Sequence, residues 1–155
     1  MIIRVKGPLW AYIFIEVPML YKVNELYNNA KYPNWEDRLK LFEEGNIRLT
    51  EKIKLLNANP GVKIMEFGTR RRFSKEWQKK VLQRLLNETT NIVGTSNVAL
   101  AKEFGITPLG TTAHLYSQVY QAIVHPVDSQ KKFFQDWADF WGDKFLIALT
   151  DIFPQ

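Results

Sequence analysis

Apolar residues in the first part of the chain recur every three to four positions, which is the spacing of one face of a helix. Residues 10–27 carry such a stripe, and we expect a buried helix there with a kink at Pro18. A second helix is predicted after Pro33, because Asn34 can cap it and the apolar spacing resumes. Its stripe contains Leu39, Phe42, Leu49, Ile53 and Leu56.

Beyond Gly61, short apolar runs alternate with helical stretches. Strands are predicted at residues 62–67, 91–94, 107–111 and 145–150. Helices are predicted at residues 74–87, 97–104, 115–124 and 128–140, with Ser74 as the cap of the first. Strands joined in this way by helices indicate a parallel sheet covered by helices.

Polar side chains follow each predicted strand, near Arg70, Ser96, His114 and Asp151. In an α/β barrel the loops after the strands converge on the barrel mouth, where sites are built. Four strands make about half of an eight-stranded barrel. We therefore expect an α/β fold with a partial parallel barrel over residues 59–155, preceded by a helical segment over residues 1–58.

Composition narrows the class of protein. The 155 residues are 46% apolar and 24% charged, which is typical of a globular domain, and we expect Phe14 and Phe140 in its core. The chain has no cysteine, which excludes disulfides, thiol catalysis and cysteine-bound zinc. A net charge of +5 suits an anionic ligand. Without a signal-peptide pattern or a membrane-spanning apolar run, we expect a cytoplasmic protein with no membrane contact.

Arg70, Arg71 and Arg72 place three cations in the loop after the first predicted strand. The planar guanidinium donates paired hydrogen bonds to phosphate or carboxylate and stays charged near neutrality. A solvated basic turn is an equal alternative. A module that binds nucleic acid is a further one, but no groove-reading motif accompanies the triplet, and we expect no nucleic-acid partner.

His114 lies between a predicted strand and a helix, where an imidazole can act as acid, base or nucleophile. Asp151 could accept a hydrogen bond from it and fix its tautomer. The alternatives are a structural histidine and an aspartate that caps a helix. His125 precedes a proline and is interpreted as a turn residue. The sequence has no metal-ligand cluster and no phosphate-binding glycine loop.

Four ordered motifs together resemble those of nicotinate phosphoribosyltransferases. They are EFGTRRRFS at residues 66–74, GTSN at 94–97, ALAKEFGITPLGTTAH at 99–114 and ALTD at 148–151. Residues 7–25 are also similar to the family's segment before its barrel. The resemblance implies the fold of a type II phosphoribosyltransferase.

The resemblance also implies an enzyme that joins nicotinate to phosphoribosyl pyrophosphate in NAD biosynthesis, with ATP and Mg²⁺ as cofactors. His114 would carry a phosphoryl group during turnover, and Asp151 would hold its ring. Phe67 would stack on the pyridine ring, and Arg70 would meet the anionic substrates. Ser96 stands where related nicotinamide-using enzymes carry an aspartate. A neutral side chain there avoids repelling the carboxylate of nicotinate.

By this resemblance the chain corresponds to the central part of the family's sequence. Leu115 follows His114 where the family usually has glutamate. We expect an excerpt or a truncated form with little or no activity, completed by a second copy in a homodimer or by the missing segments. The alternative is a non-catalytic remnant that acts as an oligomer or interaction subunit.

Overall fold

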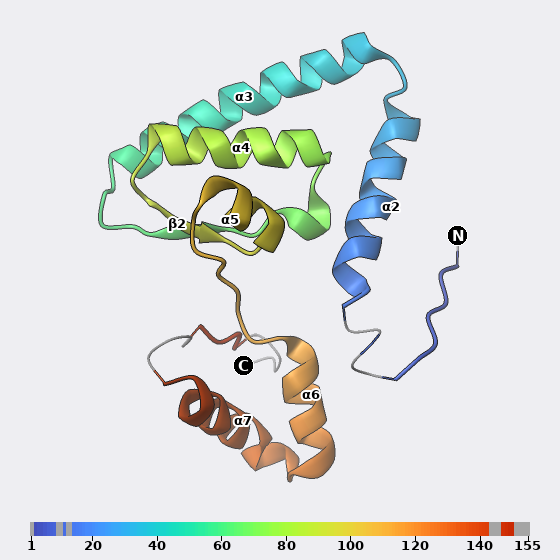
Figure 1. The fold of residues 1–155 in the computed structure, drawn as a ribbon, viewed down its shortest axis with the longest axis vertical. Helices are drawn as coiled ribbons and strands as arrows, with labels where there is room; N and C mark the ends of the chain where they lie inside the picture. Colours follow the sequence, from blue (N-terminus) through green and yellow to red (C-terminus); the bar gives the residue numbers. More distant parts are fainter. Residues whose placement is uncertain (1, 9–10, 12–13, 143–146, 151–155) are drawn as a thin grey trace. The chain divides into compact units, whose positions relative to one another are not determined.

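The computed structural model describes residues 2–8, 11, 14–142 and 147–150. Within these residues the fold is mostly helical and contains one small parallel sheet (Figure 1). The chain divides into two compact units, Met1–Leu109 and Gly110–Gln155. The division predicted at residue 58, between a helical segment and a barrel, stays a prediction.

The first described helix, α2 (Glu16–Lys31), begins later than its apolar stripe. Pro18 lies in the first turn of α2, where the N–H that proline lacks would have no partner within the helix. The helix therefore begins just before Pro18, and the proline does not kink it as expected. The expectation of a buried helix is wrong, since α2 has no buried residue and Leu26 is 67% exposed. Phe14, expected in the core, is also exposed. The other early positions of the stripe include residues outside the described ranges.

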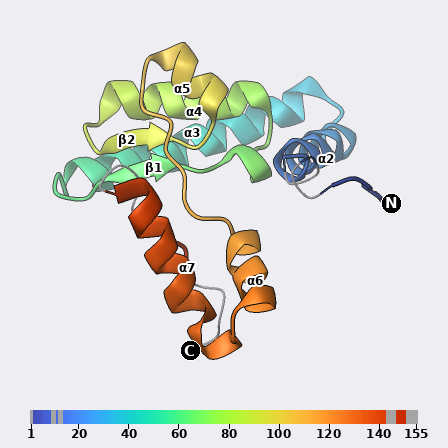
Figure 2. The same cartoon turned by 60° about the horizontal axis from the view of Figure 1, so that its bottom comes forward.

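The core of the first unit forms between α3 (Trp35–Asn57) and α4 (Lys75–Glu88), which run side by side (Figures 1 and 2). Both helices were predicted, and Ser74 caps α4 by accepting from the Trp77 N–H at 3.1 Å. Burial of apolar surface stabilises this contact. The packed side chains are Leu49, Ile53, Leu56, Val81, Leu85 and Ile92.

Two short strands, β1 (Ile64–Glu66) and β2 (Ile92–Thr95), pair in parallel, and α4 is the connection between them. Their register places Ile64 opposite Ile92 and Glu66 opposite Thr95. Because Ile92 belongs to the core cluster, α3 and α4 cover one face of the sheet. Helix α5 (Val98–Phe104) follows β2 directly, as predicted.

The strand predicted at residues 107–111 does not form. The segment makes only a single isolated parallel bridge, between Thr95 and Pro108, within the described residues. The Leu109 N–H donates to the Thr95 carbonyl at 2.9 Å, so the segment does lie beside β2. This close approach requires glycine at position 94, because a Cβ there would overlap the Thr107 carbonyl and lie 2.8 Å from Leu109 Cδ1. The half barrel itself stays a prediction.

The second unit packs α6 (His114–Ile123) against α7 (Pro126–Trp141). Phe133 is its buried centre and contacts Tyr120 with ring centroids 5.4 Å apart. Phe140, expected in the core, is 78% exposed. Of the fourth predicted strand, residues 145–146 lie outside the described ranges. Residues 147–150 form no strand, although the Thr112 N–H donates to the Ile147 carbonyl at 3.2 Å.

None of the helices in the described ranges is long and apolar enough to cross a membrane.

The contact between β2 and residues 107–109 gives a test of the fold. Gly94→Ala should lower the free energy of unfolding by about 1–3 kcal/mol, because the added methyl group overpacks the site. Gly61→Ala is the matched control, since no atom lies within 4 Å of a Cβ built there. Urea denaturation of the two variants measures the difference. Equal stability of both would contradict the close approach at Gly94.

Candidate functional site

Two of the predicted substrate-binding residues follow the two paired strands. Phe67 comes directly after β1 and is 48% exposed, and Ser96 comes directly after β2. The Ser96 N–H donates to the Glu66 carbonyl at 2.9 Å. Arg70 lies in the short 3₁₀ helix η1 (Thr69–Arg71) that follows Phe67. The structure therefore brings these three residues to the carboxyl end of one small sheet, where α/β proteins bind ligands.

Glu66, the last residue of β1, accepts hydrogen bonds from several segments at this end of the sheet. Its Oε1 accepts from the Gly68 N–H at 2.6 Å, and its Oε2 accepts from the Thr95 hydroxyl at 2.6 Å. The side-chain amide of Gln78 on α4 donates to both oxygens, at 3.1 and 3.2 Å. One carboxylate thus links the loop after β1, the end of β2 and α4.

A second set of hydrogen bonds joins the two loops. Thr69 Oγ1 accepts from Gln78 Nε2 at 2.8 Å and from Asn97 Nδ2 at 3.2 Å. Asn97 also caps α5, because its side chain accepts from the Leu100 N–H at 3.1 Å. Sequence reasoning did not identify Glu66, Gln78 or Asn97 as parts of the site.

The three consecutive arginines have different surroundings. Arg70 is half exposed and forms an ion pair with Glu16 at the start of α2. Arg71 is exposed. The Arg72 side chain is only 8% exposed; its Nε donates to Glu25 at 2.8 Å and its guanidinium lies 4.0 Å from the centre of the Tyr21 ring. The basic triplet is therefore not one uniform anion site.

The loop that carries the arginines is also held to α2 through its backbone. Asn24 Nδ2 donates to the Arg70 carbonyl at 2.9 Å, and Asn28 Nδ2 donates to the Phe73 carbonyl at 3.2 Å. With the Arg72–Glu25 pair, these bonds fix α2 to the loop despite the exposure of its apolar side chains. Helix α2 thus belongs to the scaffold of the site.

His114 begins α6 in the second unit and is exposed. Asp151 lies outside the described residues, so the pairing of these two side chains stays a prediction. His125, interpreted from the sequence as a turn residue, lies between α6 and α7 and caps α7 by accepting from the Val127 N–H at 3.4 Å.

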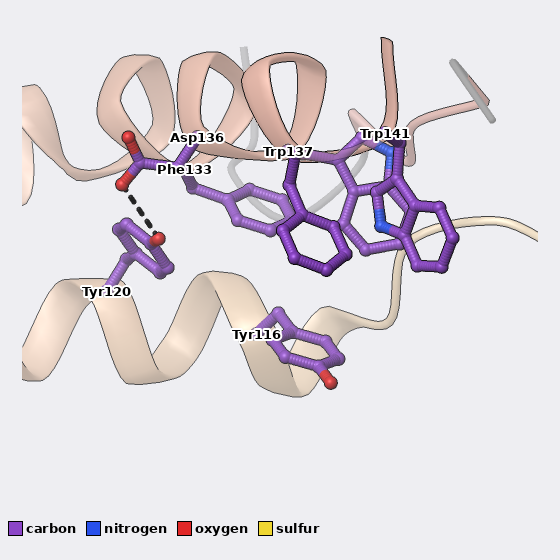
Figure 3. A pocket seen from close by; sticks show the side chains of 7 residues that line it. Tyr116, Tyr120, Phe133, Asp136, Trp137 and Trp141 are labelled. Atoms are coloured by element: carbon purple, nitrogen blue, oxygen red, sulfur yellow. Dashed lines mark hydrogen bonds between the residues drawn. The ribbon is translucent and has the colours of Figure 1, made fainter. Parts of the chain in front are cut away.

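A cavity of about 400 Å³ lies between α6 and α7 in the second unit (Figure 3). The Tyr120 hydroxyl donates to Asp136 Oδ2 at 2.9 Å. Hydrogen bonds from Lys132 and Tyr120 lower the pKa of Asp136, so this carboxylate stays ionised near neutrality. Among the described residues, no predicted site residue lines this cavity. Its lining consists of Tyr116, Tyr120, Phe133, Asp136, Trp137, Phe140 and Trp141.

Comparison with known proteins identifies the family. The profile of the Nicotinate phosphoribosyltransferase (NAPRTase) family matches residues 62–155. The chain belongs to the nicotinate phosphoribosyltransferase family. A relative named nicotinate phosphoribosyltransferase from Xanthomonas campestris pv. campestris is 40% identical over 154 residues, covering 97% of this chain and 37% of its own. The corresponding protein of Burkholderia mallei is 42% identical over 158 residues, covering 97% and 38%.

Solved nicotinate phosphoribosyltransferases share the fold of the chain. The Vibrio cholerae structure matches with a TM-score of 0.69 at 30% identity, over 87% of this chain and 32% of its own. The Porphyromonas gingivalis structure matches with a TM-score of 0.70 at 28% identity, over 86% and 33%. The chain thus spans about a third of these nicotinate phosphoribosyltransferases and 37% to 38% of the curated relatives named above.

The different surroundings of the arginines can be tested by substitution. Arg72→Ala should lower the free energy of unfolding by about 3 kcal/mol, because it leaves the partly buried Glu25 carboxylate with only the exposed Lys22 ammonium, 3.6 Å away. Arg71→Ala, one residue away and exposed, should change it by less than about 0.5 kcal/mol. Chemical denaturation measures both values. A stability loss of equal size in the two variants would show that the buried ion pair is not what distinguishes Arg72.

Proposed function

We propose that this chain carries the nicotinate-binding part of a nicotinate phosphoribosyltransferase. The reaction joins nicotinate to phosphoribosyl pyrophosphate and releases pyrophosphate and nicotinate mononucleotide, a step of NAD biosynthesis. The observation that carries the proposal is the meeting of Phe67, Arg70 and Ser96 at the carboxyl end of the paired strands. An aromatic ring, a cation and a neutral hydroxyl are the groups that an aromatic carboxylate needs.

Each of the three residues has a distinct role in the proposal. The half-exposed ring of Phe67 stacks on the pyridine ring, because offset aromatic rings attract. The Arg70 guanidinium binds the carboxylate of nicotinate. Ser96 leaves that carboxylate without a like-charged neighbour, whereas an aspartate there would favour the amide of nicotinamide. Discrimination between the two ligands therefore rests on charge.

In the proposal, the ATP-dependent part of the reaction uses residues of the second unit. Departure of pyrophosphate leaves positive character on the ribose carbon and negative charge on the leaving group, which cationic side chains stabilise. His114 accepts a phosphoryl group from ATP in the proposal, and Asp151 orients its ring. The added negative charge would couple ATP hydrolysis to turnover by reorganising the pyrophosphate pocket.

Mg²⁺ receives no protein ligand in this proposal. Over the described ranges, no three histidine, cysteine, aspartate or glutamate side chains are grouped to hold a metal ion. No step is therefore assigned to the metal on this chain. The ribose-phosphate groups would be bound by a second copy of the chain or by the segments that the longer relatives possess.

Nicotinate should raise the melting temperature of the chain, and nicotinamide should not. A ligand at one hundred times its dissociation constant stabilises the folded state by about 2.7 kcal/mol, which thermal scanning detects. Ser96→Asp is the control, because the new carboxylate should remove the response to nicotinate and create one to nicotinamide. Stabilisation of the unchanged chain by nicotinamide alone would contradict the proposal.

Glu16 should compete with nicotinate for Arg70, because both present a carboxylate to the same guanidinium. Glu16→Gln should therefore tighten nicotinate binding by about two- to fivefold, which matches the small free energy of an exposed ion pair. Glu44→Gln is the matched control, since it removes an exposed ion pair with Arg48 on α3. Isothermal titration calorimetry gives both affinities. Weaker nicotinate binding by Glu16→Gln would contradict the expected competition between Glu16 and nicotinate for Arg70.

A further inference from the structure

We propose that Glu66 and Gln78 are positioning residues that hold the loop of Phe67 and Arg70 at a fixed separation from the turn of Ser96. The inference rests on the proposed function, since the separation matters for nicotinate. Neither side chain is required to touch the ligand. They act through the backbone and side chains of the two loops.

Glu66 is suited to this role because a carboxylate only accepts hydrogen bonds. Its donors come from three separate segments: the Gly68 N–H in the first loop, the Thr95 hydroxyl at the end of β2, and the Gln78 amide on α4. Thr95 is fully buried and Gln78 is 4% exposed, so water cannot freely replace the bonds that these two residues donate, whereas the Gly68 bond is exposed. An ionised acceptor also makes each bond stronger than a neutral one would.

Gln78 has one orientation that satisfies its neighbours. Its Oε1 accepts from Arg72 Nη1 at 3.2 Å, and its Nε2 donates to Glu66 and to Thr69 Oγ1. A flipped amide would direct its oxygen at the carboxylate and its N–H groups at the guanidinium, so both contacts would be lost. The charges of Arg72 and Glu66 therefore fix the amide, which in turn fixes Thr69.

Asn97 also connects the loop after β1 with the end of β2. Asn97 Nδ2 donates to Thr69 Oγ1, and the Asn97 N–H donates to Thr95 Oγ1 at 3.1 Å. Gly68 has little space beside the carboxylate, because a Cβ there would lie 2.5 Å from Glu66 Oε1. The loop backbone thus packs directly on the carboxylate. A displacement of Glu66 is transmitted to the residues on either side of Phe67 and Ser96.

The opposite end of the same strands provides a comparison. Asn91, 1% exposed, donates to the Asn59 and Val62 carbonyls at 2.9 and 2.6 Å, just before β2. This group is also buried, polar and held by several hydrogen bonds. Among the described residues, Asn91 forms no hydrogen bond to a loop at the carboxyl end of the sheet. Asn91→Ala therefore loses stability by the same mechanism without reaching the proposed site.

The first measurement needs no ligand. Glu66→Met keeps the length of the side chain but accepts no strong hydrogen bond, and it should speed amide hydrogen exchange at Gly68 and Asn97 about tenfold. Gln78→Met should have the same direction of effect. Asn91→Ala should leave exchange at Gly68 and Asn97 unchanged. Exchange at the unmodified rate in both methionine variants would overturn the proposal.

The second measurement is nicotinate affinity by calorimetry, on the full chain. Glu66→Met and Gln78→Met should each weaken binding by about tenfold, because a displaced loop misplaces Phe67 and Arg70. The double variant replaces both partners by apolar side chains, so it should regain part of the stability that each single variant loses. It should not regain affinity. That separation of stability from affinity would not result from a purely structural role.

The outcomes distinguish the two proposals. Failure of the unmodified chain to bind nicotinate contradicts the proposed function, while the exchange rates at Gly68 and Asn97 still decide the positioning role. Binding by the unmodified chain with full affinity in Glu66→Met overturns the positioning role alone. An equal loss of affinity in Asn91→Ala also overturns it, because affinity would then follow stability.

Discussion

Parallel pairing of β1 with β2 places Glu66 opposite Thr95, and the rest of the first unit depends on that register. Parallel strands end at the same edge of a sheet, so the chain leaves both strands on one side. Phe67 and Ser96 are consequently neighbours at this edge although 29 positions separate them, as the residue numbers show. A shift of one residue would direct the Glu66 side chain to the other face and disconnect the loops.

The two ends of the strands use similar polar groups for different purposes. At the amino end, the Asn91 side chain donates to the carbonyls of residues 59 and 62, in the segment that leads into β1. At the carboxyl end, Glu66 and Gln78 join the segments that carry the residues of the proposed ligand site. Between these ends, the apolar contact of Ile92 with the helices holds the sheet in place. Stability and proposed binding therefore share one scaffold.

Much of the first unit could be predicted from local patterns. The spacing of Leu49 and Ile53 identified α3, and the position of Ser74 identified the start of α4, because both signals arise within one element. The prediction of a strand at residues 107–111 was wrong, because Pro108 has no N–H to donate to a strand ladder and a single bridge forms there. Strand pairing depends on partners far away in the sequence, and the apolar pattern alone does not specify them.

The polar network was missed, although one signal for it exists in the sequence. Gln78 lies four and seven residues before Leu82 and Leu85, which places it on the buried face of α4. A polar residue on an apolar stripe requires a hydrogen-bond partner. The identity of that partner, Glu66, could not be predicted, because it follows from the packing of α4 on the sheet.

The local charge balance explains why the arginine triplet is a poor guide to binding when taken from sequence alone. Arg72 is matched by Glu25 and Arg70 by Glu16, while Glu66 is bonded to neutral donors and faces Arg72 only through Gln78. Two glutamates thus pair with two of the three arginines of this loop. In the proposed function, an anionic ligand at Arg70 exchanges with the Glu16 carboxylate, so its affinity depends on the difference between two similar contacts. In the proposed function, the choice of nicotinate over nicotinamide accordingly rests on the neutral side chain of Ser96 and not on the net charge of the arginine triplet.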